Sequence, residues 1–296
     1  MQDYMIRATA ADGQIAAYVA VTTQTVEEAR RRHGTSPVIT AALGRTMTAA
    51  ALMGWQLKAE DESITIQIDG NGPVERIVAV SNCNGEVKGY VHHPDVDLPL
   101  NDKGKLDVGG AVGLGVMSII KDIGLKEPYI GRTHLVSSEI AEDLAYYFTA
   151  SEQVPSAVAL GVLVRKDQTV WTAGGLILQM MPGATDETAE ALQEIVSNFM
   201  PVTEYFAMEH TPEELLDVLL SDFGYHILDK KEICFHCDCN KDRVSRALLS
   251  VGEAELQQMI DEGETIEMSC HYCGDKYYFT VDEMKALLAQ GKKDQD

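Results

Sequence analysis

The sequence predicts an α+β protein with an N-terminal antiparallel-sheet domain that carries helices, a helical linker and a small C-terminal zinc-binding domain. Three observations predict this class. Alternating strand patterns separated by glycine and asparagine turns fill the first part of the chain. Residues 183–229 hold eleven acidic residues and no lysine or arginine, and five of the six cysteines lie between Cys234 and Cys273. We therefore expect domains at residues 1–182, 183–231 and 232–296.

The N-terminal domain opens with a strand and two helices. Residues 13–23 alternate as a strand does, and Thr25 with Glu28 has the spacing of a capping box for the helix that follows. The pair Ser36 and Pro37 is typical of a helix start, so we expect a second helix through the apolar residues that come next.

Strands dominate the rest of this domain. Short turns join the next three strand patterns, which predicts an antiparallel meander over 63–69, 74–82 and 86–93. Two more strands, a helix near residues 138–151 and a long hairpin at 157–181 complete the predicted domain.

The longest apolar segment, residues 36–59, is predicted to be a buried helix of a globular protein. It carries Arg45 near its middle, and a central arginine is costly in lipid. The N-terminus has no basic region followed by an apolar run, as a signal peptide has. We therefore expect a cytoplasmic protein without a membrane partner.

The formal net charge is −22, from 24 basic and 46 acidic residues. A chain of this charge is repelled by the phosphates of DNA and RNA, and no basic stripe offsets the repulsion. We therefore expect no nucleic acid partner.

The acidic segment contains two amphipathic helices. The first places Leu192, Ile195, Val196 and Phe199 on one face, and the second begins at Thr211-Pro212 with Glu214 in capping position. Like charges repel along these helices, so their order should depend on docking their leucine faces elsewhere. The segment is either an ordinary acidic connector or a linker whose order is conditional. The second helix carries Leu215, Leu216, Leu219 and Leu220.

The cysteines predict a zinc site. Cys237 and Cys239 form a C-x-C hook, Cys270 and Cys273 form a C-x-x-C hook, and 30 residues separate the two. Four thiolates from two hooks suit the tetrahedral coordination of zinc. Clustered cysteines in a protein without an export signal indicate metal or redox chemistry rather than structural disulfides.

Several alternatives remain open on spacing alone. Cys234 with Cys237 makes a second C-x-x-C hook that would leave Cys239 spare, and His236 or His271 could also be a ligand. Isolated Cys83 is best interpreted as a passive thiol. A thiol–disulfide exchange enzyme would need its C-x-x-C at a helix start, whereas here a strand pattern follows.

The chain resembles the redox-regulated holdase chaperones of the heat shock protein 33 family. The C-x-C and C-x-x-C hooks have that family's spacing, and the likeness extends to residues 31–53, 151–164 and 174–183. The resemblance implies that Cys237, Cys239, Cys270 and Cys273 bind one zinc ion in the reduced state. Oxidation then forms the disulfides Cys237–Cys239 and Cys270–Cys273, and Cys234 is an accessory thiol additional to the pattern.

The function that this resemblance implies is an ATP-independent holdase. Zinc release would unfold the linker and expose a surface that binds unfolded or oxidatively damaged client proteins, with a homodimer as a further expectation for the active state. No G-x-x-x-x-G-K-[ST] loop is present, which agrees with ATP independence. No catalytic motif is legible, so we expect no enzyme. The alternatives are an enzyme or a binding domain with a purely structural zinc ribbon.

Overall fold

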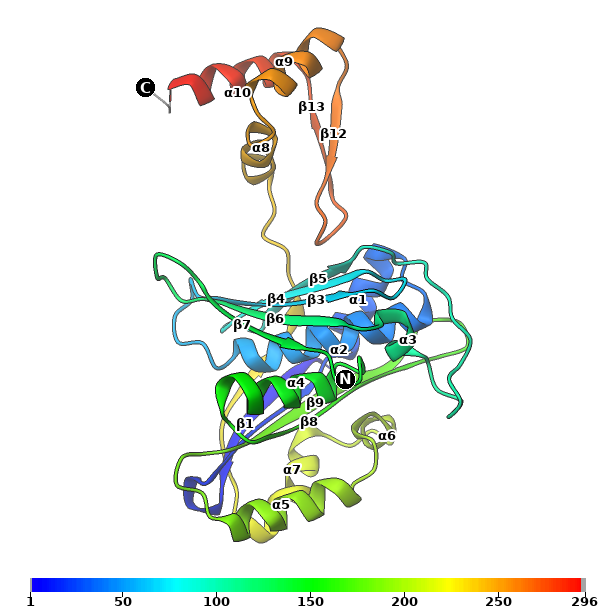
Figure 1. Cartoon of the computed structure of the whole chain (residues 1–296), viewed down its shortest axis with the longest axis vertical. Coiled ribbons are helices and arrows are strands. Elements are labelled where there is room, and N and C mark those ends of the chain that lie inside the picture. The colour runs from blue at the N-terminus through cyan, green and yellow to red at the C-terminus, as the bar shows by residue number, and fades with distance from the viewer. Residues whose placement is uncertain (1, 294–296) are drawn as a thin grey trace. The chain divides into compact units, whose positions relative to one another are not determined.

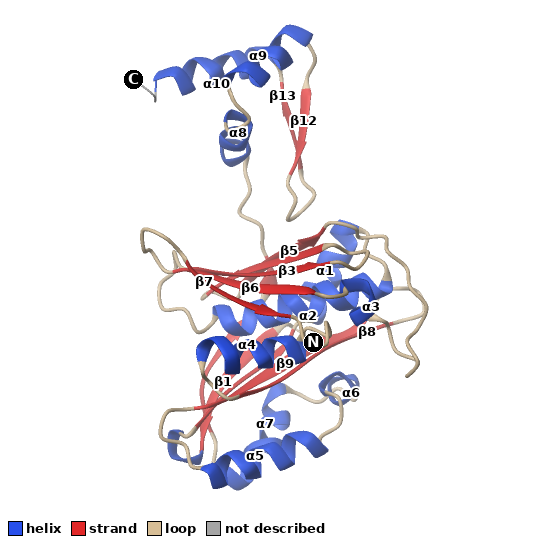
Figure 2. Cartoon of the chain, in the orientation of Figure 1, coloured by secondary structure: helices blue, strands red, loops and turns tan. Residues whose placement is uncertain are grey.

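The computed structural model describes residues 2–293 and divides into two compact units, Met1–His236 and Cys237–Asp296. Sheets and helices are mixed in both, so the predicted α+β class is confirmed (Figures 1 and 2). Residues 183–231 lie within the first unit, and the second unit begins at Cys237; the division into three domains stays a prediction. Residues 294–296 of the predicted third domain lie outside the described residues.

The first unit contains two sheets. The first sheet is antiparallel in the order β10-β1-β2-β9-β8. Its strands are β1 (Tyr4–Ala10), β2 (Ile15–Val21), β8 (Ser156–Val164), β9 (Val170–Met180) and β10 (His226–Glu232).

The second sheet has the order β11-β5-β4-β3-β6-β7 and is antiparallel except for the short parallel pair β11 and β5. The predicted meander is therefore confirmed as β3, β4 and β5. The strands are β3 (Ser63–Gly70), β4 (Arg76–Asn82), β5 (Glu86–Val91), β6 (Gly115–Asp122), β7 (Tyr129–His134) and β11 (Cys234–Phe235).

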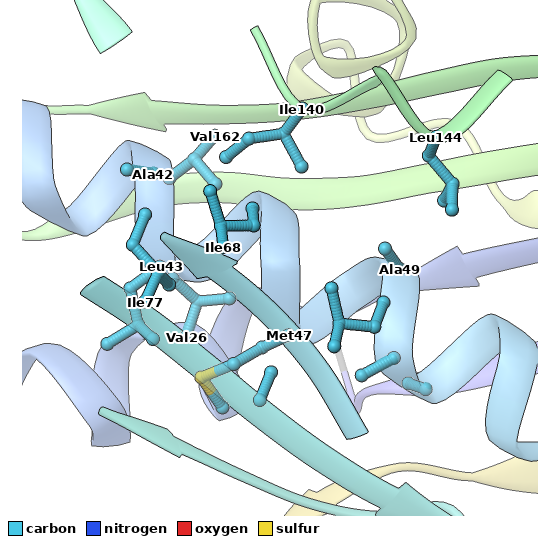
Figure 3. Packing of buried hydrophobic residues seen from close by; sticks show 14 of the residues in the cluster. Val26, Ala42, Leu43, Met47, Ala49, Ile68, Ile77, Ile140, Leu144 and Val162 are labelled. Carbon is cyan, nitrogen blue, oxygen red and sulfur yellow. The ribbon is translucent and has the colours of Figure 1, made fainter. Parts of the chain in front are cut away.

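Helix α2 (Pro37–Gly54) forms the centre of the main core. All its residues except Pro37 and Arg45 are buried, and it contacts strands of both sheets. A helix that is apolar on every side needs such surroundings. Figure 3 shows Leu43 and Met47 of α2 packed close to Ile68 and Ile77 of the second sheet. No helix among the described residues is long and apolar enough to cross a membrane.

Three further helices complete this core. They are α1 (Thr23–His33), α3 (Val108–Val112) and α4 (Ala141–Tyr147), and a short π-helix, Phe148–Glu152, follows α4. The predicted capping box at Thr25 is wrong, because α1 begins two residues earlier. The backbone N–H groups of Gln24 and Thr25 instead donate to the buried carboxylate of Asp3, which precedes β1. A distant residue thus replaces the local cap.

The acidic segment forms helices that cover the second face of the first sheet (Figure 1). These are α5 (Asp186–Asn198), α6 (Val202–Ala207) and α7 (Pro212–Leu220), of which α6 was not predicted. The predicted capping box of Thr211 and Glu214 is present. The helices bury apolar side chains against β1, β2 and β9; the buried ones are Leu192, Val202, Tyr205, Phe206, Leu215, Leu216, Leu219 and Leu220.

Helix α6 approaches the sheet where strand glycines leave room. A Cβ atom on Gly161 of β8 would lie 2.5 Å from Thr203 Cγ2, and one on Gly174 of β9 would lie 2.7 Å from Phe206 Cε2. Both contacts are closer than side chains allow. The missing side chains therefore make the docking surface for α6.

A polar contact joins α7 to two strands of the sheet. The Tyr4 hydroxyl donates to Glu213 Oε2 at 2.6 Å, Lys230 Nζ lies 3.0 Å from Glu213 Oε1, and the same ammonium lies over the Tyr4 ring. Among the described residues, Glu213 is the one carboxylate of the segment 183–229 with a lysine or arginine within 4.0 Å. Burial opposes its ionisation, but these two donors hold the pKa of Glu213 below its usual value.

The second unit has a small core of its own. Leu248, Leu256, Ile260, Phe279 and Met284 are its buried apolar residues. Thr280 and Glu283 cap its last helix. Its elements are α8 (Lys241–Leu249), α9 (Glu253–Glu262), β12 (Ile266–Ser269), β13 (Lys276–Phe279) and α10 (Val281–Lys293).

We predict that Gly161→Ala weakens the docking of α6. The new methyl group would overlap Thr203, and overpacking of this kind costs about 1–3 kcal/mol. Urea unfolding should show the loss, and amides of Val202–Ala207 should exchange faster with solvent. Adding Thr203→Ala removes the overlapping atoms and should restore most of the stability. Equal stability of Gly161→Ala and wild type would contradict this account of the docking.

We also predict that Glu213→Gln loosens α7 at neutral pH. Because the folded-state pKa of Glu213 is depressed, its stabilising effect is present above the unfolded value of 4.5 and is lost as pH falls through the folded value. The variant and wild type should therefore differ in melting temperature at pH 7 and converge in acid. Exposed Glu194→Gln removes the same charge without breaking an ion pair and serves as the control. An equal loss in both variants at pH 7 would contradict a specific role for Glu213.

Candidate metal centre

Four cysteines of the second unit converge at one point. The loop before α8 supplies Cys237 and Cys239, and the loop between β12 and β13 supplies Cys270 and Cys273. Their sulfur atoms all lie within 4.8 Å of one another. Cys237 Sγ is 3.8 Å from Cys270 Sγ, and Cys239 Sγ is 3.3 Å from Cys273 Sγ. No disulfide joins these four cysteines.

Local backbone geometry shapes the second hook. The N–H of Gly274 donates to the carbonyl of Cys270, and the N–H of Cys270 donates to the carbonyl of Asp275. Gly274 has a φ of +75°, a conformation that suits a residue without a Cβ atom. At the first hook, Asn240 caps α8 directly after Cys239. The hooks are therefore a tight turn and a helix entry.

The cluster has the dimensions of a tetrahedral metal site. Metal–sulfur bonds of about 2.3 Å in a tetrahedron place the sulfur atoms about 3.8 Å apart. Cys237 and Cys270 match this separation, and Cys239 and Cys273 lie somewhat closer together. Burial raises the pKa of Cys237 to about 11, and burial also raises the pKa of Cys273. Four thiolates crowded together need a cation to neutralise them, so the donor set fits a thiophilic metal ion.

Tyr277 contributes a polar contact that sequence analysis missed. Its hydroxyl lies 3.1 Å from Cys239 Sγ. Burial opposes ionisation of Cys239, but the hydrogen bond from Tyr277 and the neighbouring thiols lower the pKa of Cys239. Strand alternation is the signal that could have identified this residue. Phe279, two positions along β13, is buried, whereas intervening Tyr278 is exposed.

The other candidate residues lie outside the cluster. Cys234 is on β11 in the first unit and is exposed, while His236 and His271 are not among the four clustered ligand residues. Burial raises the pKa of Cys234, and the carboxylates of Glu86 and Glu232 add to the effect. Cys83 is buried and its thiol donates to the carbonyl of Ala59, as expected for a passive thiol.

The fold and the cysteine cluster together define a class of protein, a mixed two-sheet unit followed by a small four-cysteine module. Residues 3–280 match the family described as Hsp33 protein. The 33 kDa chaperonin of Lachnoclostridium phytofermentans is 49% identical over 290 residues, which cover 98% of this chain and 99% of the relative. The 33 kDa chaperonin of Staphylococcus aureus strain Newman is 47% identical over 287 residues, covering 97% and 98%.

A solved structure gives the same result. The crystal structure of the 33 kDa chaperonin (Hsp33 homolog) from Thermotoga maritima superposes with a TM-score of 0.91 at 39% identity, and covers all of both chains. The chain belongs to the Hsp33 family, so the resemblance predicted from the sequence is confirmed.

We predict that Tyr277→Phe makes the cysteine cluster more reactive. With a metal ion bound, all four sulfurs would already be thiolates, so losing the phenol would not change how much of Cys239 is ionised. It would remove a hydrogen bond that lowers the nucleophilicity of the Cys239 sulfur, and losing a bond worth about 1 kcal/mol should accelerate alkylation of the metal-loaded cluster by up to about fivefold. Tyr278→Phe is the matched control, because Tyr278 is exposed on the opposite face of β13. Equal rates in the two variants would remove Tyr277 from this role.

Proposed function

We propose that the protein is a redox-regulated, ATP-independent holdase chaperone that is inactive when reduced and metal-bound. One pair of observations carries the proposal. Four cysteines gather where a single cation would be needed, and acidic helices cover an apolar sheet face in the preceding unit. The names of the relatives support a chaperone role, and oxidation chemistry at the cysteines supplies the switch.

Zinc is the proposed ion, and Cys237, Cys239, Cys270 and Cys273 are its proposed ligands. Bound zinc would hold the four sulfurs as thiolates and fasten both hooks of a unit whose core has five buried apolar residues. Binding of structural zinc can contribute about 10 kcal/mol or more to folding. A unit of this size therefore should depend on the ion for its stability.

Oxidation would open the switch. Two thiolates of one hook give up two electrons to peroxide or hypochlorite, which is reduced to water or chloride, and a sulfur–sulfur bond forms. We propose the pairs Cys237–Cys239 and Cys270–Cys273, which are the pairs that the resemblance to the Hsp33 family implies. Disulfide sulfurs are poor ligands, so the ion is released. Cys234 is the proposed accessory thiol.

Residues 183–231 would then act as the conditional linker. Of eleven carboxylates in 183–229, one has a lysine partner, so repulsion favours detachment once the following unit unfolds. Detachment would expose the linker leucines and the face of β1, β2 and β9 beneath them. Exposed apolar surface of this kind binds unfolded or oxidatively damaged client proteins.

The remaining expectations are part of the same proposal. We infer a cytoplasmic protein with no enzymatic activity. We also infer that neither nucleic acid nor a membrane is a partner, because the net charge of −22 repels anionic surfaces. A homodimer is the proposed assembly of the active state.

We predict that hypochlorite treatment releases one zinc ion per chain and abolishes amide protection in residues 183–232. Suppression of client aggregation should appear at the same oxidant dose. Cys83→Ser should behave as wild type, since Cys83 is outside the cluster, whereas Cys273→Ser should lose zinc without oxidant. Cys234→Ser should change the rate of activation but leave one zinc bound.

Zinc loss without client protection would overturn the chaperone proposal in favour of a structural zinc ribbon. Zinc loss with unchanged protection of residues 183–232 would remove the linker from the switch.

A further inference from the structure

Strand β10 pairs with β1 at one edge of the first sheet. Without β10, β1 would be an exposed edge strand, open to pairing with other chains. Strand β1 is apolar, and five of the seven β1 residues are buried. The last four residues of β10 are all charged: Asp229, Lys230, Lys231 and Glu232. Charged edge strands are a common device against edge-to-edge pairing, because an uncovered apolar strand is a template for other chains.

Strand β10 is held on the sheet mainly by backbone pairing with β1. Six of its seven residues are exposed, so its side chains bury little surface against the sheet. Its register with β1 shifts between Arg7 and Ala8, where Leu228 is skipped and stays 58% exposed. Because backbone pairing and not side-chain packing holds β10, another extended segment could take its place. The edge of β1 would select little among the side chains of such a segment.

The contacts of β10 tie it to the segments that would move. Lys230 binds Glu213 of α7, and the chain passes from β10 through β11 to Cys237 within five residues of Glu232. Ile233, buried in the main core, and Lys231, which donates to the carbonyl of Cys83, anchor the far end of the strand. The other end of the strand, at His226–Leu228, lies beyond the register shift and follows α7 in the chain after the short turn Ser221–Phe223, so release of α7 would free it first.

We propose that β10 blocks the edge of β1 in the reduced protein, and that its release lets an extended segment of an unfolded client pair with β1 as a new edge strand. The inference rests on the proposed function and specifies how clients are held. Backbone pairing is independent of sequence, which suits a protein that must bind many unrelated chains, and the adjacent apolar face would take the client's side chains.

Hydrogen exchange tests the opening of the edge in the full-length protein. Amides of Tyr4–Ala10 that pair with β10 should lose protection on oxidation and regain it when a thermally unfolded client is added. Amides between β2 and β9 should stay protected throughout and are the internal control. Oxidised protein that suppresses aggregation while β1 keeps its full protection would overturn strand addition and leave the holdase proposal standing.

A labelled peptide with the sequence of residues 225–233 tests directly whether the edge of β1 accepts an added strand, independently of the experiments with clients. It should bind the oxidised protein, compete with client, and bind the reduced protein at least about tenfold more weakly. Two versions, one N-methylated at Asp229 and Lys231 and the other at Lys230 and Glu232, are the matched probes for the two phases, because these four residues all lie on one side of the register shift. The phase that blocks the edge facing β1 should lose at least about tenfold in affinity, and the other phase should bind like the parent peptide. Equal affinity of both phases, or no binding by the parent, would overturn the proposal.

Discussion

An acidic helical segment docks on an apolar sheet face in spite of the repulsion among its own carboxylates. Helices α5, α6 and α7 have almost no ion pairs to lysine or arginine, so local charge works against their order. Burial of a leucine or phenylalanine side chain contributes about 1.5–3 kcal/mol, and eight buried side chains offset that repulsion. Glycines at two strand positions and the contact of Tyr4 with Glu213 fix where the segment sits.

Strands, rather than a flexible tether, connect the acidic helical segment to the small four-cysteine unit along the chain. After α7 the chain forms β10 on the first sheet and β11 on the second before it reaches Cys237. The unit that follows has few buried apolar residues and a cluster of thiols that cannot all ionise without a cation. Loss of that unit would leave β10 and β11 as a terminal segment, and terminal strands fray.

Patterns that depend on neighbours in sequence were predictable. The meander, the capping boxes at Thr211 and Thr280, and the four cysteines that cluster all follow from local spacing. The features that were missed depend on distant partners. Helix α6 is short and is placed by strand glycines, β10 is too polar to be recognised except by its pairing with β1, and Asp3 caps a helix some twenty residues away.

The magnitudes decide whether metal loss suffices to free the segment. Shifting a two-state equilibrium from 1:99 to 99:1 takes about 5.5 kcal/mol. Metal-dependent folding of a small cysteine module can supply about 10 kcal/mol or more, so transmission of roughly half would be enough. The contact of Lys230 with Glu213 and Tyr4 is where β10, β1 and α7 meet. Carboxylates that lack a lysine or arginine partner repel one another along the docked helices, so the segment would be easier to release than one held by apolar contact without that repulsion. In the proposed switch, the acidity of residues 183–231 would therefore lower the free energy that metal loss has to supply.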